Sequence, residues 1–128
     1  MKALAPKIAR YLLGLIFFLA GLVGLLNLAP PPTDLPEALM TFTNGLVAAK
    51  YFMPLLKTTE TVCGLLLLTG FAPALALIIL APISINIFFT HLFLTPGVQN
   101  IVLPVIIVAL HVTAATAYWR IYRPLFNR

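Results

Sequence analysis

Among the residues inside the long apolar runs of this chain, Glu60 is the one best able to do chemistry. It lies about eight residues into the run that starts at Phe52, roughly 12 Å along a helix that rises about 1.5 Å per residue. An ionised carboxylate at that depth in a bilayer is costly unless it is paired. Lys57, one helical turn earlier on the same face, can form that pair. Because Met53, Lys57, Glu60 and Gly64 follow helical spacing, this polar face is predicted to point into the protein.

Four further polar residues within apolar runs or at their ends are candidates for a site: Asn27, Asn86, His91 and His111. The first three fall in the outer halves of their runs, as Glu60 and its neighbouring lysine do. A bundle could therefore gather them into one pocket that opens to the outside, with His111 deeper. Such residues inside a membrane are candidates for a ligand-binding site. The alternative is that they satisfy one another as hydrogen bonds between helices, each worth about 0.6–2 kcal/mol.

Complete motifs for the common kinds of catalytic site are absent from the sequence. There is no glycine-rich phosphate loop, no metal-spaced set of histidines and cysteines, and no nucleophile elbow. Cys63 is the single cysteine, which excludes an intrachain disulfide and a cysteine metal cluster and favours a small apolar filler. We therefore predict no metal site and no cofactor, assign no catalytic residue, and favour a protein that is not an enzyme.

The elements that must position these residues follow from composition. Hydrophobic residues make up 62% of the chain and charged residues 9%, whereas a soluble domain has about 45–50% and about 25%. A bilayer can accommodate that apolar surface, and each crossing helix needs roughly 20 apolar residues. We predict an all-α membrane protein, a single transmembrane domain over residues 1–128. Its four-transmembrane-helix bundle has spans at about 11–29, 52–71, 73–93 and 100–119.

The connection between the first two spans is predicted to contain a short interfacial helix over about 35–48. Asp34 followed by Glu37 is a capping-box-like start. An apolar stripe then recurs at helical spacing, at Leu35, Leu39, Phe42 and Leu46. The segment is too short and too polar to span a membrane, so it is expected to lie at the outer interface. It could either cover the bundle or act as a lid over an outward-facing cavity.

Smaller signals refine the packing of the spans. Gly14, Ala20, Gly21 and Gly24 can bring the first span close to a neighbour. Pro82 is predicted to kink the third span.

The distribution of basic residues predicts the topology. Six of them flank the first and last spans: Lys2, Lys7, Arg10, Arg120, Arg123 and Arg128. The positive-inside rule then puts both termini in the cytoplasm. Tyr118, Trp119 and Tyr122 would form an inner aromatic belt. The net charge of +5 marks the membrane boundary, and no groove-reading motif accompanies it, so no nucleic-acid partner is predicted.

Several segments resemble the DoxX family of small membrane proteins. The segment 57–70 is similar to the family's second helix, with a Glu, then a Gly, then a leucine run that ends in Gly. Residues 82–91 resemble its third helix, and residues 10–14 with Ala20 and Gly21 resemble its entry helix. The resemblance covers nearly the whole chain and includes the four-span layout.

This resemblance implies a multi-pass protein of the bacterial inner membrane, and it relates Glu60, Asn86 and His91 to the family's polar positions. Some family members are linked to quinone-dependent sulfur oxidation or to redox-stress complexes, and a distant animal branch, NACHO, assists receptor assembly. Two functions stay open. The first is a binding or accessory protein whose pocket holds a lipid, a quinone or a partner's helix. The second is the membrane subunit of a quinone-linked redox complex. A protein partner in the membrane and a homo-oligomer are both compatible with the sequence.

Overall fold

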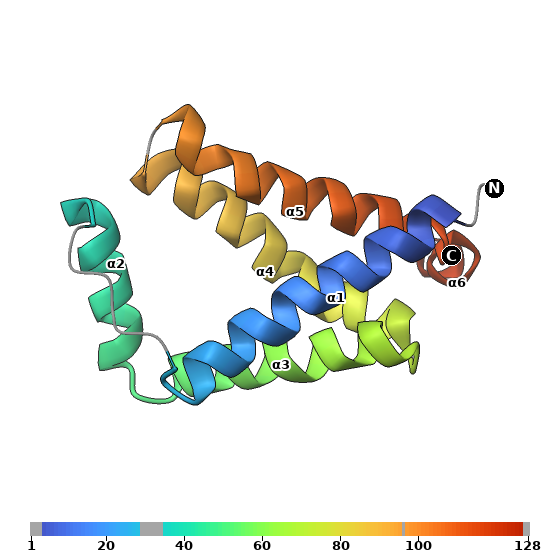
Figure 1. The fold of residues 1–128 in the computed structure, drawn as a ribbon, viewed down its shortest axis with the longest axis horizontal. Helices are drawn as coiled ribbons and strands as arrows, with labels where there is room; N and C mark the ends of the chain where they lie inside the picture. The colour runs from blue at the N-terminus through green and yellow to red at the C-terminus, as the bar shows by residue number, and fades with distance from the viewer. Residues whose placement is uncertain (1–3, 29–34, 96, 127–128) are drawn as a thin grey trace.

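The computed structural model describes residues 4–28, 35–95 and 97–126, and helices are the only regular elements in these residues (Figure 1). Four helices are long and apolar enough to cross a membrane. They are α1 (Leu4–Leu25), α3 (Phe52–Thr69), α4 (Pro73–Leu94) and α5 (Val98–Thr116). The shorter elements are α2 (Glu37–Ala48), α6 (Trp119–Tyr122) and the 3-10 turn η1 (Arg123–Phe126). The predicted all-α bundle of four spans, with a short helix between the first two, is confirmed.

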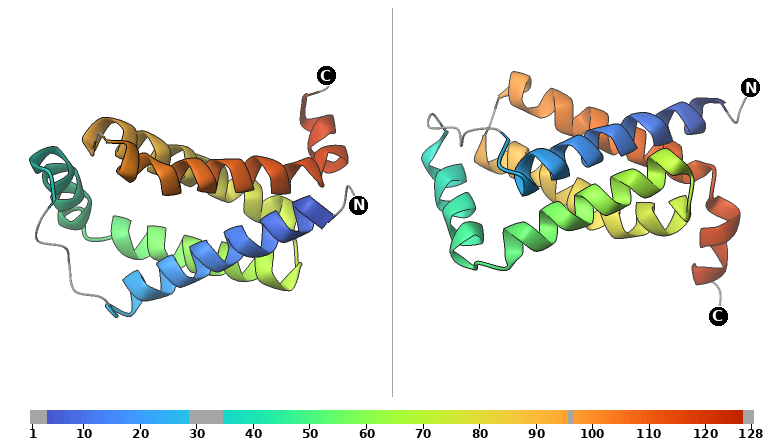
Figure 2. Two further views of the ribbon diagram at one scale, coloured as in Figure 1. Left: turned by 45° about the horizontal axis from the view of Figure 1, so that its top comes forward. Right: turned by 60° about the horizontal axis from the view of Figure 1, so that its bottom comes forward.

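The long helices form two packed pairs, α1 with α3 and α4 with α5, and the two pairs cross each other. Helix α1 packs on α3 and α5, and α4 packs on α5 and α3 (Figures 1 and 2). The start of α1 and the helix α6 lie at one end of the bundle, whereas α2 lies at the opposite end (Figure 1). An apolar core from four helices joins the pairs: Ala9, Leu13, Phe17, Cys63, Leu67, Ala76, Leu77, Leu80, Ile107 and Ala114. Four spanning helices bring the start of α1 and the helix α6 to the same end of the bundle (Figure 1).

Glycines allow α1 and α3 to approach almost to backbone contact. A Cβ atom added to Gly64 would lie 2.8 Å from the carbonyl oxygen of Gly14 and would also meet the backbone of Phe18. A Cβ on Gly21 would come equally close to the α3 backbone. The close packing predicted from small residues is therefore present for the glycines, whereas Ala20 is exposed on the other side of α1. Contacts of this kind hold membrane helices together because lipid supplies no hydrophobic force between them.

The first helix starts earlier than the apolar pattern predicts, at Leu4 rather than near Tyr11. Lys7 and Arg10 lie in its first turns. Both residue types are good helix formers, and their long side chains can lie along an apolar surface while the charged group stays in water. Hydropathy therefore marks the apolar part of this helix and not its full length.

The end of α1 is set by a left-handed asparagine. The helix ends at Leu25, and Ala29, its predicted end, lies outside the described residues. Asn27 has a φ of 53°, and the N–H of Leu28 donates to the carbonyl of Val23 at 3.0 Å. This is a Schellman-type ending, in which asparagine is one of the few residues that tolerate the required backbone.

The last span is shorter than predicted. We expected it to run to Trp119, but α5 ends at Thr116 and Trp119 begins the separate helix α6. The turn between them brings Tyr122 against the bundle, where its Oη donates to the carbonyl of Ala74 at 2.7 Å. Tyr122 is therefore buried and does not face a membrane interface, unlike the exposed Trp119.

Helix α2 begins at Glu37 with Pro36 in the N-cap position, and the expected cap Asp34 lies outside the described residues. Helix α2 contacts both α3 and α4. Three members of its predicted apolar stripe are half-buried, Leu35, Leu39 and Leu46, whereas Phe42 is exposed. The α4 helix continues on both sides of Pro82.

Candidate functional site

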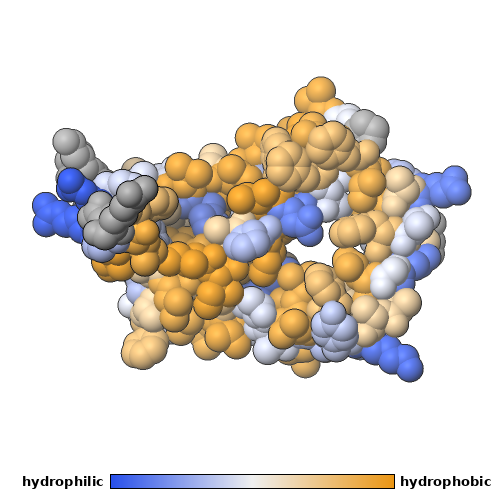
Figure 3. Space-filling model, turned by 180° about the vertical axis from the view of Figure 1, so that it is seen from behind, coloured by the Kyte–Doolittle hydropathy of each residue, from blue (hydrophilic) through white to orange (hydrophobic). Residues whose placement is uncertain are grey.

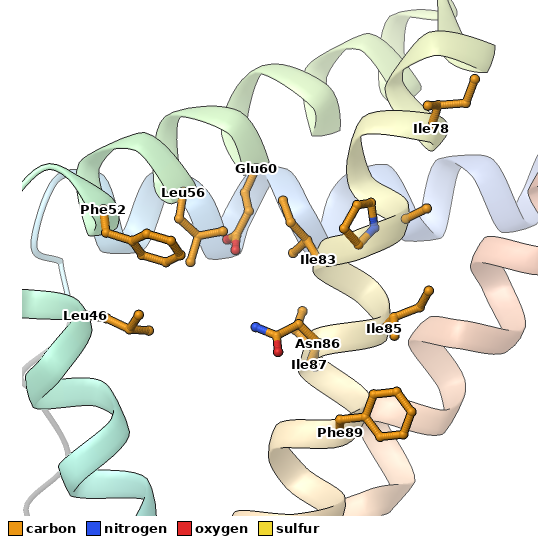
Figure 4. A pocket seen from close by; sticks show the side chains of 12 residues that line it. Leu46, Phe52, Leu56, Glu60, Ile78, Ile83, Ile85, Asn86, Ile87 and Phe89 are labelled. Atoms are coloured by element: carbon orange, nitrogen blue, oxygen red, sulfur yellow. The ribbon is translucent and has the colours of Figure 1, made fainter. Parts of the chain in front are cut away.

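The candidate site is a pocket of about 850 Å³ between α2, α3 and α4. In the space-filling view from behind, an opening separates α2 from the body of the bundle (Figure 3). Ten of the twelve lining residues are apolar, and the whole lining comprises Leu46, Phe52, Leu56, Glu60, Ile78, Ala81, Pro82, Ile83, Ile85, Asn86, Ile87 and Phe89. The two remaining residues, Glu60 and Asn86, come from different helices, and both extend into the pocket (Figure 4).

Glu60 is buried, with only 4% of its surface exposed. Its Oε1 lies 3.4 Å from Nζ of Lys57, so the ion pair predicted from their spacing is present. The side-chain stem of Lys57 crosses Gly24 of α1, where an added Cβ would lie 2.6 Å from it. The glycine thus leaves room for a lysine that reaches the carboxylate from the side of α1. The Lys57–Glu60 pair lies at the wall of the pocket.

Asn86 stands across the pocket from Glu60, on α4 (Figure 4). In the described parts of the chain its amide has no hydrogen-bond partner, and the residue is exposed toward the cavity. A primary amide can both donate and accept hydrogen bonds. The pocket therefore offers a carboxylate and an amide to one polar group of a ligand, within otherwise apolar walls.

His91 and Asn27 do not join this pocket. His91 bonds within its own helix, since Nδ1 lies 2.8 Å from the carbonyl oxygen of Ile87 and must donate to it. Thr95 in turn donates to the carbonyl of His91 at 3.0 Å. Asn27 ends α1 through its left-handed backbone. The structure thus brings together Glu60, Lys57 and Asn86 from the predicted set, without His91 and Asn27.

His111 occupies a separate buried position between α4 and α5. Nε2 lies 2.9 Å from the carbonyl oxygen of Leu77, and Nδ1 lies 2.9 Å from Oγ of Ser84. A carbonyl only accepts, so Nε2 carries the proton, and in a neutral ring Nδ1 accepts from the serine hydroxyl. The pairing of His111 with Ser84 was not predicted from the sequence. Hydrogen bonds of this kind join helices inside a membrane.

A second pocket of about 300 Å³ is lined in part by His111 and lies toward the end of the bundle that carries α6. Apart from His111, its lining is apolar and aromatic: Leu77, Ile78, Ala81, Ala115, Trp119, Tyr122, Leu125 and Phe126. The apolar walls of both pockets were not predicted, because isoleucines and leucines facing a cavity look the same in sequence as those facing lipid.

The side chains that line the first pocket can form hydrogen bonds and apolar contacts. Among residues 4–28, 35–95 and 97–126, no three His, Cys, Asp or Glu side chains are grouped so that they could hold a metal ion. Cys63 is buried in the core, as expected of a small apolar filler. The first pocket combines a polar pair with long apolar walls, which suits a molecule that is itself polar at one end.

Four helices long and apolar enough to cross a membrane, one of which carries the Lys57–Glu60 ion pair, define a multi-pass helical membrane protein. Residues 5–92 match the DoxX family, and the chain belongs to that family. The matched region contains α2, α3 and nearly all of α1 and α4, and it includes the whole lining of the first pocket. Neither the comparison with curated proteins nor that with solved structures gives a match.

Proposed function

We propose that this DoxX-family protein is a binding or accessory protein that holds an amphiphile, a lipid or a quinone, in the pocket between α2, α3 and α4. The observation that supports the proposal most is the pairing of Glu60 with an apolar cavity. A charged pair inside a membrane is costly, and α3 keeps one beside a pocket wide enough for a small molecule. If the only role of Glu60 were to pack α3 against its neighbours, an apolar residue at that position would do this as well.

The position of α2 agrees with a binding role. Leu46 of α2 closes one wall of the pocket, while α3 and α4 supply the others (Figure 4). No residue of α2 is buried in the bundle. A helix held so lightly can move aside at little cost, which would let an amphiphile enter from the outer leaflet. In this proposal α2 is a lid, and the pocket faces outward in a plasma membrane.

The test is native mass spectrometry of the protein purified from its membrane, together with lipid extraction. The wild-type chain should retain one small amphiphile, and its mass distinguishes a lipid from a quinone. Asn86→Ala should weaken retention about two- to tenfold, the effect of one net hydrogen bond of about 0.5–1.5 kcal/mol. Asn44→Ala is the matched control, because Asn44 is exposed on α2 and does not line the pocket.

Glu60→Gln tests whether the charge takes part. Glutamine keeps the shape and the hydrogen bonding of the side chain but removes the charge, so a folded variant with reduced retention supports a charge-dependent role. Glu60→Leu removes both properties and should mainly lower thermal stability if the residue only joins helices. A folded wild-type protein that carries no bound amphiphile, in both measurements, would contradict the proposed function.

A further inference from the structure

The two pockets share a wall on α4. Ile78 and Ala81 line both of them. Ile78, Ala81, Ile85 and Phe89 recur at intervals of three and four residues, so they lie along one face of the helix. Ala81 is the smallest side chain on that face, between two isoleucines. The shared wall therefore leaves the most room at Ala81.

The shared face of α4 leads from the first pocket to the second, and the two pockets differ in chemistry. The first pocket carries the carboxylate of Glu60 and the free amide of Asn86. In the second pocket, both ring nitrogens of His111 are already bonded within the protein, and the rest of the lining is dominated by aromatic and aliphatic groups such as Trp119 and Phe126. A ligand that follows the path would thus find hydrogen-bonding groups at one end and an apolar surface at the other.

We infer that the two pockets form one groove along α4 that holds a single-chain amphiphile with a hydroxyl-bearing head. The head lies against Glu60 and Asn86, and the chain passes Ala81 and ends against Trp119. A hydroxyl suits this end because the carboxylate paired with a lysine accepts hydrogen bonds, whereas an oxidised quinone has none to donate. The inference rests on the proposed function and specifies its ligand.

The length of the path determines the kind of chain. From Asn86, beside the head, to Leu77 in the second pocket, α4 rises about 14 Å at about 1.5 Å per residue, close to half of a bilayer core of about 30 Å. The second pocket continues the path toward α6. The tail would thus end near Trp119, at the end of the bundle opposite α2 (Figure 1). Tails of ordinary bilayer lipids end near the bilayer centre, so this arrangement is distinct from a surrounding lipid.

Trp119 provides the measurement, because it is the single tryptophan of the chain. Bromine atoms quench tryptophan fluorescence on contact. The probes are octadecyl glycerol ethers brominated either at the chain end or next to the head, added to the full-length protein in phosphatidylcholine bilayers. The chain-end probe should quench Trp119 more strongly than the head-end probe. Excess unlabelled octadecyl glycerol should displace the probes and remove this difference in quenching. Added phosphatidylcholine should not.

Two substitutions of equal size distinguish the groove from general lipid contact. Ala81→Phe fills the shared wall and should abolish the excess quenching by the chain-end probe. In native mass spectrometry it should weaken retention of the octadecyl ether more than that of the short octyl glycerol ether, whose chain ends near Ala81. Ala109→Phe is the control, because Ala109 is exposed on α5 and lines neither pocket. This variant should behave as the wild type.

The outcomes distinguish a failure of the proposed groove from a failure of the proposed binding function. If the octyl and octadecyl ethers bind but the chain-end probe quenches no better than the head-end probe, the groove is refuted and the proposed pocket stands. The groove is also refuted if Ala81→Phe quenches as the wild type does, because the bromine then reaches Trp119 from surrounding lipid. If a folded protein binds neither ether, the hydroxyl-bearing ligand is refuted. If it also retains no amphiphile from its own membrane, the proposed function fails with it.

Discussion

At the scale of single residues, the structure separates polar groups that serve the backbone from those that face a cavity. Asn27 ends a helix, and His91 bonds to a carbonyl of its own helix. His111 joins α4 to α5 through two hydrogen bonds. Asn86, in contrast, presents its amide to the pocket, and Glu60 does the same with a carboxylate held by one lysine. Residue type alone does not distinguish these roles.

Tyr122 gives a prediction at this scale because it lies outside the four spans. Burial, and then the nearby Tyr118, raise the pKa of the Tyr122 phenol to about 12. An unfolded tyrosine has a pKa of about 10. The neutral, hydrogen-bonded phenol is therefore favoured by folding, and its contribution is complete below about pH 10 and is lost between about pH 10 and 12.

Tyr122→Phe should lower the free energy of unfolding by about 0.5–1.5 kcal/mol near neutral pH, because it removes the hydrogen bond to Ala74. The difference between the variant and the wild type should shrink as the pH rises above about 10. Thermal unfolding in detergent micelles at several pH values measures both effects. Tyr51→Phe, at an exposed position, is the control and should be neutral near pH 7. A pH-independent difference for Tyr122→Phe would contradict this assignment.

At the scale of elements, the packing of α1 on α3 depends on glycines, whereas no residue of α2 is buried. The two glycines Gly64 and Gly45 show the contrast. Both lie inside helices, but a Cβ on Gly64 would meet the backbone of α1, and a Cβ on Gly45 would meet nothing within 4 Å. The same substitution should therefore have opposite effects at the two positions.

Gly64→Ala should destabilise the bundle by about 1–3 kcal/mol, because backbone on the facing helix must move to admit the methyl group. Gly45→Ala should be neutral or stabilising by up to about 1 kcal/mol, since alanine is the better helix former. Melting temperatures of the two purified variants, compared with that of the wild type, measure both effects. Equal melting temperatures for the two variants would show that the close approach of α1 and α3 is not a constraint.

At the scale of the whole molecule, the two ends of the described chain lie at one end of the bundle and α2 lies at the other (Figures 1 and 2). With the basic residues at the chain ends, the positive-inside rule predicts that α2 lies outside the cell. This orientation decides from which leaflet a ligand reaches the pocket.

Cysteine labelling tests the orientation. Thr41→Cys, at an exposed position on α2, should react with a membrane-impermeant maleimide in intact cells. Lys7→Cys should react only after the cells are opened. The native Cys63 is buried and should remain unlabelled in the folded wild type, which serves as the background control. Labelling of Lys7→Cys in intact cells would reverse the topology and with it the outward-facing pocket.

Sequence alone determined the class of the protein and its main elements. Four long apolar runs have few stable solutions other than spanning helices, because a bilayer leaves no other partner for backbone groups. The spacing of Lys57 and Glu60 within one helix was enough to predict their ion pair, since neighbours on a helix face are fixed by local geometry. The glycines of α1 likewise pointed to close packing without identifying the partner helix.

Only the tertiary structure decided which polar residues meet. Asn86 faces Glu60 and His111 bonds to Ser84 because of the rotation of each helix about its axis, which side-chain packing with neighbouring helices sets. The shared wall at Ala81 has the same origin. An apolar residue that lines a cavity and one that faces lipid have the same chemistry, so hydropathy cannot separate them. A pocket in a membrane protein therefore becomes visible only when its helices are packed together.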